Sequence, residues 1–224
     1  MTSHTGAIYT DGPVRRILEL AVAVQESAGE LSLDDELRRF VRTVKGAGAT
    51  DWACPLVTVT ALLDHVADLC AGDGGDEGTP RDFRELLRRA TGGTDPSGYL
   101  RTLAGMLRIL AQDPASDFEE LPMARWEANL RFSALVGFGV NWVYEGEYAT
   151  LRESIEAAIS SEHPFCAEFL APLASQAQSA LVIRPGVHGV ANGLAGMIGW
   201  ATPAALRQVI EAIDAHMRQE HAAP

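Results

Sequence analysis

The stretch Pro122–Glu145, PMARWEANLRFSALVGFGVNWVYE, carries the clearest indication of the fold. Most of its middle is apolar, and steps of four and three residues connect Glu127, Arg131 and Asn141 along one face of a helix. A helix that is apolar nearly all round is usually buried. We therefore predict one long, buried helix over 122–145, with a polar stripe that ends at Glu145.

Outward from this stretch, a capping residue followed by proline marks further helix starts. The pairs are Thr79-Pro80, Asp95-Pro96 and Thr202-Pro203. Proline is tolerated at the first helical position because its missing N–H would have no partner there. Between these marks the apolar residues recur at three and four, and no stretch sustains the alternation of a strand. The sequence ALVI at 180–183 is too short for its period to decide between strand and helix.

These patterns predict an all-α protein, a compact multi-helix bundle of about ten helices in two layers. The expected helices span 13–28, 33–45, 55–71, 80–91, 96–112, 122–145, 147–160, 164–181, 188–199 and 203–221. A chain of 224 residues buries enough surface to fold without disulfides or metal. We expect a single helical domain over 1–224, with residues 1–12 as a flexible end.

Cysteine usage and hydropathy predict a cytoplasmic protein. Cys54, Cys70 and Cys166 are odd in number and lack paired spacing, which is typical of reduced thiols. The first twenty residues do not have the pattern of a secretory signal. No apolar run reaches the roughly 20 residues that a membrane-spanning helix requires, so we expect no membrane partner.

The charge balance constrains the partners. A formal net charge of -12 argues against nucleic acid, because binding to a phosphate backbone requires a basic face. It fits solubility or attraction of a cationic ligand. Of the 18 basic residues, Lys45 is the single lysine, which we interpret as the codon bias of a high-GC bacterial genome.

The polar stripe of the 122–145 helix is the first candidate site. Ligand sites combine apolar walls with a few convergent polar groups, so we expect Glu127 and Glu145 to act as acid and base in a pocket for a small molecule. The residues expected to bind the substrate there are Trp126, Arg131, Phe138, Asn141 and Trp142. The alternative is a surface stripe, or a buried salt bridge that only fixes packing.

The segment NWVYEGEY at 141–148 adds Tyr144 and Glu147 to the expected substrate-binding residues. Aromatic rings beside carboxylates suit an amine or another cation, because ring faces attract positive charge. An ordinary helix corner has the same composition, and that alternative stays open.

A glycine-rich stretch, Arg184–Trp200, is the second candidate element. Its expected helix places His188 and Asn192 four residues apart on one face, and we expect His188 to be catalytic and Asn192 to bind substrate. Each glycine costs a helix roughly 1 kcal/mol relative to alanine, so something must compensate. Close approach of another helix is one compensation, and a ligand on the exposed backbone is the other.

Known metal and cofactor motifs are missing from the sequence, so we expect neither. Asp64, His65 and Asp68 share a helix and are interpreted as a solvated face, since no Glu-x-x-His, H-E-x-x-H or paired-cysteine motif occurs. His216, Glu220 and His221 are interpreted as frayed surface residues of the last helix. Cys166 is interpreted as a buried, inert thiol, and a reactive thiol at a helix start is the alternative.

Two functions of different classes fit these residues. The first is a cofactor-independent enzyme, a cyclase or lyase of bacterial specialised metabolism, that uses carboxylates as acid and base for cyclisation or elimination of an amine-bearing or cationic small molecule. The second is a non-catalytic helical module that binds a ligand or another protein, with a homodimer as one form.

Overall fold

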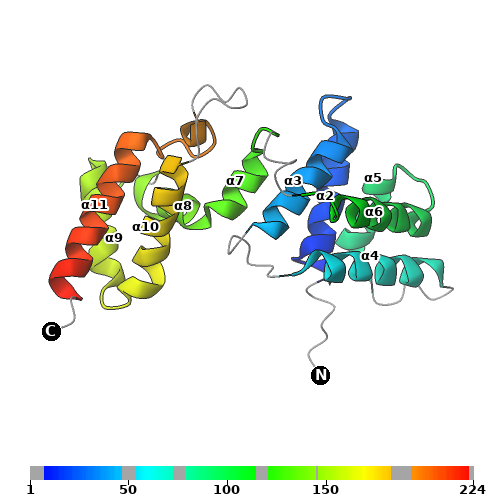
Figure 1. Cartoon of the computed structure of the whole chain (residues 1–224), viewed down its shortest axis with the longest axis horizontal. Coiled ribbons are helices and arrows are strands. Elements are labelled where there is room, and N and C mark those ends of the chain that lie inside the picture. The colour runs from blue at the N-terminus through cyan, green and yellow to red at the C-terminus, as the bar shows by residue number, and fades with distance from the viewer. Residues whose placement is uncertain are drawn as a thin grey trace. The chain divides into compact units, whose positions relative to one another are not determined.

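A computed structural model describes residues 8–46, 54–72, 79–114, 121–144, 146–182 and 193–221 (Figure 1). These residues form ten α-helices and no strand, which confirms the all-α fold class. No helix in the described ranges has the length and apolar character to cross a membrane. The chain divides into two compact units, Met1–Leu121 and Pro122–Pro224, and each is described by itself. The single domain expected over 1–224 stays a prediction.

The N-terminal unit consists of five long helices. They are α2 (Pro13–Glu26), α3 (Leu33–Lys45), α4 (Leu56–Ala71), α5 (Arg81–Thr91) and α6 (Pro96–Leu110). Their bounds agree with the predicted ones to within about two residues, because the signals that start and stop these helices are local in sequence. Residues that the sequence spaces at three and four form the core, among them Ile17, Phe40 and Leu103.

Side-chain caps explain where these helices begin. The Asp95 carboxylate accepts hydrogen bonds from the backbone N–H groups of Ser97 (3.2 Å) and Gly98 (2.7 Å), so it satisfies two donors that have no partner within α6. Ser32 caps α3 by accepting a hydrogen bond from Asp35 N–H. At the other end of α6, the Lys45 ammonium donates to the carbonyls of Ala111 and Asp113, both at 2.9 Å.

Helices α4 and α6 are linked by ion pairs that use the acidic face predicted on α4. Asp64 pairs with Arg108, and Asp68 pairs with Arg101 at 2.8 Å. His65 lies between them and is exposed. The acidic side chains are therefore partners of α6, and exposed pairs of this kind contribute about 0–1 kcal/mol each.

The C-terminal unit contains shorter and less regular elements. They are α7 (Arg125–Arg131), α8 (Ser133–Phe138), the π-helical segment η2 (Gly139–Val143), α9 (Leu151–Glu162), α10 (Cys166–Val182), the 3-10 turn η3 (Gly193–Gly196) and α11 (Pro203–Glu220). The segment ALVI contributes its first three residues to the end of α10, so the short strand considered there is wrong for those residues. Helix α9 begins at residue 151 because Thr150 and Glu153 form a capping box.

The prediction of one continuous helix over 122–145 is wrong. The helix breaks at Phe132, whose backbone (φ -121°, ψ 41°) is not helical. Beyond the break, the side-chain oxygen of Gln176 on α10 accepts hydrogen bonds from the N–H groups of Ala134 (2.8 Å) and Leu135 (3.4 Å). A distant side chain thus satisfies the donors that a break exposes, which local spacing does not reveal.

Trp200 packs against the second irregularity, the π-helical segment that begins at Gly139. Its indole N–H donates to the Leu135 carbonyl at 3.1 Å, and its ring lies 5.0 Å from that of Phe138. A Cβ atom on Gly139 would approach the indole nitrogen to 2.6 Å, so glycine is required where the ring packs. A π-helical segment has wider turns than an α-helix. The spacing of three and four residues that was expected to align the polar stripe therefore does not hold beyond residue 138.

The helix expected over 188–199 is wrong for its described part. Gly193–Gly196 form a single 3-10 turn, and Trp200 lies in the turn that precedes α11. Glycine lowers helix stability, which agrees with a short turn in place of a helix. The Trp200 side chain that follows this turn is buried in the core. His188 and Asn192 lie outside the described residues.

We expect Gly139→Ala to destabilise the C-terminal unit by about 1–3 kcal/mol, because the added methyl group displaces the Trp200 indole. Urea unfolding followed by tryptophan fluorescence measures this, since Trp126, Trp142 and Trp200 belong to that unit. Gly137→Ala is the matched control. Apart from its chain neighbours and the backbone of its own helix, no described atom lies within 4 Å of the Cβ it would add, and alanine gains up to about 1 kcal/mol in a helix. Equal effects of both substitutions would contradict the packing argument.

We expect Asp95→Ala to destabilise the N-terminal unit by about 1 kcal/mol, because two backbone donors lose their acceptor. Asp68→Ala, which removes an exposed ion pair, should cost less. Denaturation followed by far-ultraviolet circular dichroism compares the two variants. A larger loss for Asp68→Ala would overturn this ranking.

Candidate metal centre

The carboxylate of Glu127 has a structural position in the C-terminal unit. Glu127 is buried, and its side chain accepts a hydrogen bond from the Ala124 N–H at 3.3 Å, at the start of α7. Arg131 is exposed and lies over the Phe132 ring, with 5.7 Å from its guanidinium carbon to the ring centre. These two residues therefore have different surroundings, although they are four apart on α7.

Other residues of the expected substrate site are spread over α7, α8, the π-helical segment and the residues that follow it. Phe138 is buried against Trp200, and Trp126 is half-buried. The rings of Trp142 and Tyr148 lie 6.1 Å apart. Asn141, Tyr144 and Glu147 are exposed. Glu145, His188 and Asn192 lie outside the described residues, so the catalytic and substrate-binding roles expected from the sequence stay predictions.

Four other side chains of the C-terminal unit converge closely. They are His163, Cys166, His216 and His221, and each places one nitrogen or sulfur atom within 4.8 Å of the others. The Cys166 Sγ lies 3.2 Å from His216 Nε2 and 3.7 Å from His163 Nδ1. Ring centres of the three histidines are 5.3–5.5 Å apart. The structure thus gathers one thiol and three imidazoles at one point.

Helix ends position these four groups. His163 directly follows α9, and Cys166 is the first residue of α10, so both belong to the corner between the two helices. His216 lies in the second half of α11, and His221 directly follows that helix. Figure 1 shows the end of α11 in red near the connection between α9 and α10. Packing of α10 against α11 brings the two pairs together.

The spacing of these atoms fits tetrahedral metal coordination. A zinc ion with Zn–N distances of about 2.0–2.1 Å and Zn–S of about 2.3 Å places its ligand atoms roughly 3.3–3.6 Å apart. The two distances from Cys166, 3.2 and 3.7 Å, lie close to that range. None of the remaining ligand atoms is farther than 4.8 Å from another.

Burial and charge favour the metal-binding form of the cluster. Partial burial lowers the pKa of His216, the neighbouring His221 and His163 lower it further, and Glu220 acts in the opposite direction. A lowered pKa keeps this imidazole neutral, which is the form that binds a metal. Cys166 is fully buried, whereas His163 and His221 are exposed. The cluster is therefore open to solvent at His163 and His221, whereas the Cys166 sulfur is shielded.

The sequence contains a signal for this site that motif inspection missed. His163 and Cys166 are separated by two residues, and His216 and His221 by four. Structural zinc sites commonly space their first pair by two to four residues and their second by three to five. A histidine in place of the first cysteine hides the pattern from a search for paired cysteines. The interpretation of His216 and His221 as frayed surface residues overlooked this spacing.

Comparison with known proteins found no similar protein. No family model matches the chain, no curated protein matches it, and neither does any solved structure.

Proposed function

We propose that the C-terminal unit binds a divalent transition-metal ion, zinc above others, through His163, Cys166, His216 and His221. The observation that carries this proposal is the convergence of four nitrogen and sulfur donors within 4.8 Å. Three of these four residues are histidines, and neutral imidazole is the commonest metal ligand among side chains.

The donor set supports the choice of metal. Magnesium and calcium prefer oxygen ligands, whereas imidazole together with thiolate suits zinc. Zinc binding deprotonates the Cys166 thiol, and the resulting thiolate offsets part of the ion's charge. Because nickel and copper also bind imidazole, affinity alone does not identify the ion, and coordination geometry is the better criterion.

The proposed role of the ion is structural. Catalytic zinc keeps one coordination position open for water or substrate, whereas four protein ligands close the site. The ligands join the α9–α10 corner to the end of α11, so the bound ion acts as a cross-link between segments about 50 residues apart. A ligand that binds only the folded state at 100 times its Kd stabilises that state by about 2.7 kcal/mol.

We expect the metal-free protein to bind one Co²⁺ with the visible spectrum of a tetrahedral complex and a thiolate-to-cobalt band in the near ultraviolet. Zn²⁺ should displace the cobalt and abolish both features. Cys166→Ser should remove the thiolate band, whereas Cys54→Ser, which alters a thiol of the other unit, should leave it intact. An octahedral cobalt spectrum, or an unchanged band in Cys166→Ser, would contradict the assigned ligands.

We expect saturating Zn²⁺ to raise the Tm of the C-terminal unit by roughly 10–20 °C at 100 times the Kd, because the ion binds only the folded state. His221→Gln, an exposed substitution at the end of α11, should reduce the shift to a small fraction. His65→Gln, at an exposed histidine of the N-terminal unit, should leave it unchanged. Calorimetry with and without a chelator measures these shifts. An equal Zn²⁺ response in His221→Gln would exclude that residue as a ligand.

A further inference from the structure

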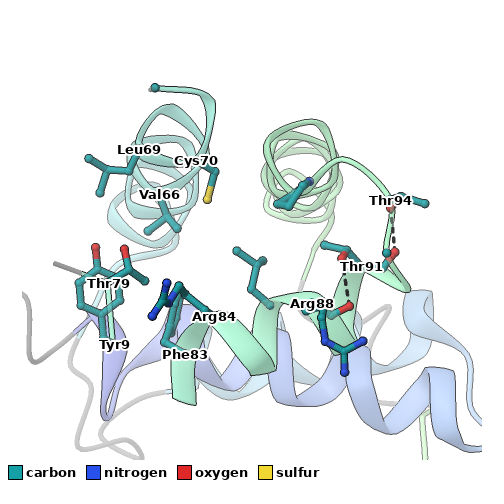
Figure 2. Close-up of a pocket in the computed structure, with 14 residues that line it drawn as sticks. Tyr9, Val66, Leu69, Cys70, Thr79, Phe83, Arg84, Arg88, Thr91 and Thr94 are labelled. Carbon is teal, nitrogen blue, oxygen red and sulfur yellow. Dashed lines mark hydrogen bonds between the residues drawn. The ribbon is translucent and has the colours of Figure 1, made fainter. Parts of the chain in front are cut away.

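The N-terminal unit contains a pocket of about 590 Å³ that shares no residue with the proposed metal site. Helix α4 contributes Val66, Leu69 and Cys70 to its lining, and α5 contributes Phe83 and Leu87 (Figure 2). Val66, Phe83 and Leu87 are buried and belong to the core of this unit. Pockets of roughly 300–1,000 Å³ with apolar walls hold small molecules. Both the volume and the helical walls therefore suit a small-molecule ligand.

Polar side chains of the lining already interact within the chain. The Arg88 guanidinium donates two hydrogen bonds to the Glu85 carboxylate, at 2.9 and 2.6 Å. The Thr91 hydroxyl donates to the Arg88 carbonyl at 3.2 Å, and the Thr94 hydroxyl donates to the Thr91 carbonyl at 2.7 Å, as drawn in Figure 2. Thr79 and Arg84 have interactions of their own as well. A ligand that recruited these groups would compete with existing partners.

Hydrogen bonding within the unit points to the same kind of ligand. Among the described residues, Ser97 alone has a buried side-chain oxygen without a hydrogen-bond partner, and Ser97 does not line the pocket. The described lining therefore contains no buried side-chain donor or acceptor that needs a ligand to satisfy it. An ionised ligand between these helices would lose hydration, and burial of a charge without a dedicated partner is costly. An uncharged ligand avoids that cost.

We propose that this pocket binds an uncharged, apolar small molecule whose carbon skeleton lies between α4 and α5. Removal of apolar surface from water supplies the affinity, through side chains such as Val66, Leu69 and Leu87. Tyr9 and Phe83, whose rings pack edge to face with 4.8 Å between centres, also line the pocket and suit an aromatic skeleton. Because the pocket belongs to the N-terminal unit alone, this proposal and the metal site can each fail without the other.

Cys70 provides a built-in reporter of occupancy. It lines the pocket and is half-buried, and burial raises the pKa of its thiol. Cys54 of the same unit is also half-buried, with a thiol pKa raised by burial, but it does not line the pocket. A ligand between α4 and α5 covers the Cys70 sulfur and slows its alkylation, and Cys54 serves as the internal control.

The test titrates the full chain with N-phenyl-1-naphthylamine, an uncharged aromatic compound, and measures iodoacetamide alkylation of both cysteines by peptide mass spectrometry. We expect saturable slowing at Cys70 and no change at Cys54. The compound 8-anilino-1-naphthalenesulfonate has the same skeleton with an added sulfonate, and it should bind roughly tenfold more weakly because burial of its charge is costly. Unchanged alkylation of Cys70 would overturn the pocket, and equal protection by the sulfonate would overturn the preference for an uncharged ligand.

Substitution of the two cysteines completes the test. Cys70→Phe should weaken binding of N-phenyl-1-naphthylamine roughly tenfold, as followed by the fluorescence of the compound, because the added ring occupies volume that the ligand needs. Cys54→Phe makes the same change outside the pocket and should leave the affinity unchanged. Circular dichroism verifies that both variants keep their helices. Equal affinities in the two variants would exclude this pocket as the binding site.

Discussion

Antiparallel packing of α10 against α11 is the contact on which the C-terminal unit depends. Leu170, Leu173 and Ala177 of α10 and Val209 and Ile213 of α11 are buried in one core. Because the helices run in opposite directions, the first residue of α10 meets the end of α11. The Cys166 Sγ therefore lies 3.2 Å from His216 Nε2, although the two residues are 50 positions apart in the sequence. Apolar burial supplies the energy for this arrangement, and the polar cluster forms where the two helix ends coincide.

Trp200 imposes the second constraint on this unit. Its ring requires glycine at 139, and its indole N–H donates a hydrogen bond to the Leu135 carbonyl. These contacts link α8 to the turn that precedes α11. The π-helical segment over Gly139–Val143 is where this packing replaces regular helix. Local irregularity here accompanies a well-filled core, which agrees with the common association of π-helical segments with special packing or function.

The two units offer different chemistry. In the C-terminal unit, four ligands from the protein leave a metal ion no open position, so the ion would contribute stability and no reaction centre. In the N-terminal unit, the pocket beside α4 and α5 is lined by both apolar and polar side chains.

Local signals in the sequence determined the all-α class and the bounds of most helices. Ser32 and Asp95 cap helices through neighbours within three residues, so α3 and α6 were predicted closely. The break at Phe132 was not predictable in this way, since it is accompanied by contacts from Gln176, a residue over 40 positions away. The sequence likewise contains the spacing of the two pairs in the proposed metal site, His163 with Cys166 and His216 with His221. Only the tertiary packing of α10 on α11 decided that they meet, because apolar burial between distant helices has no local spacing rule.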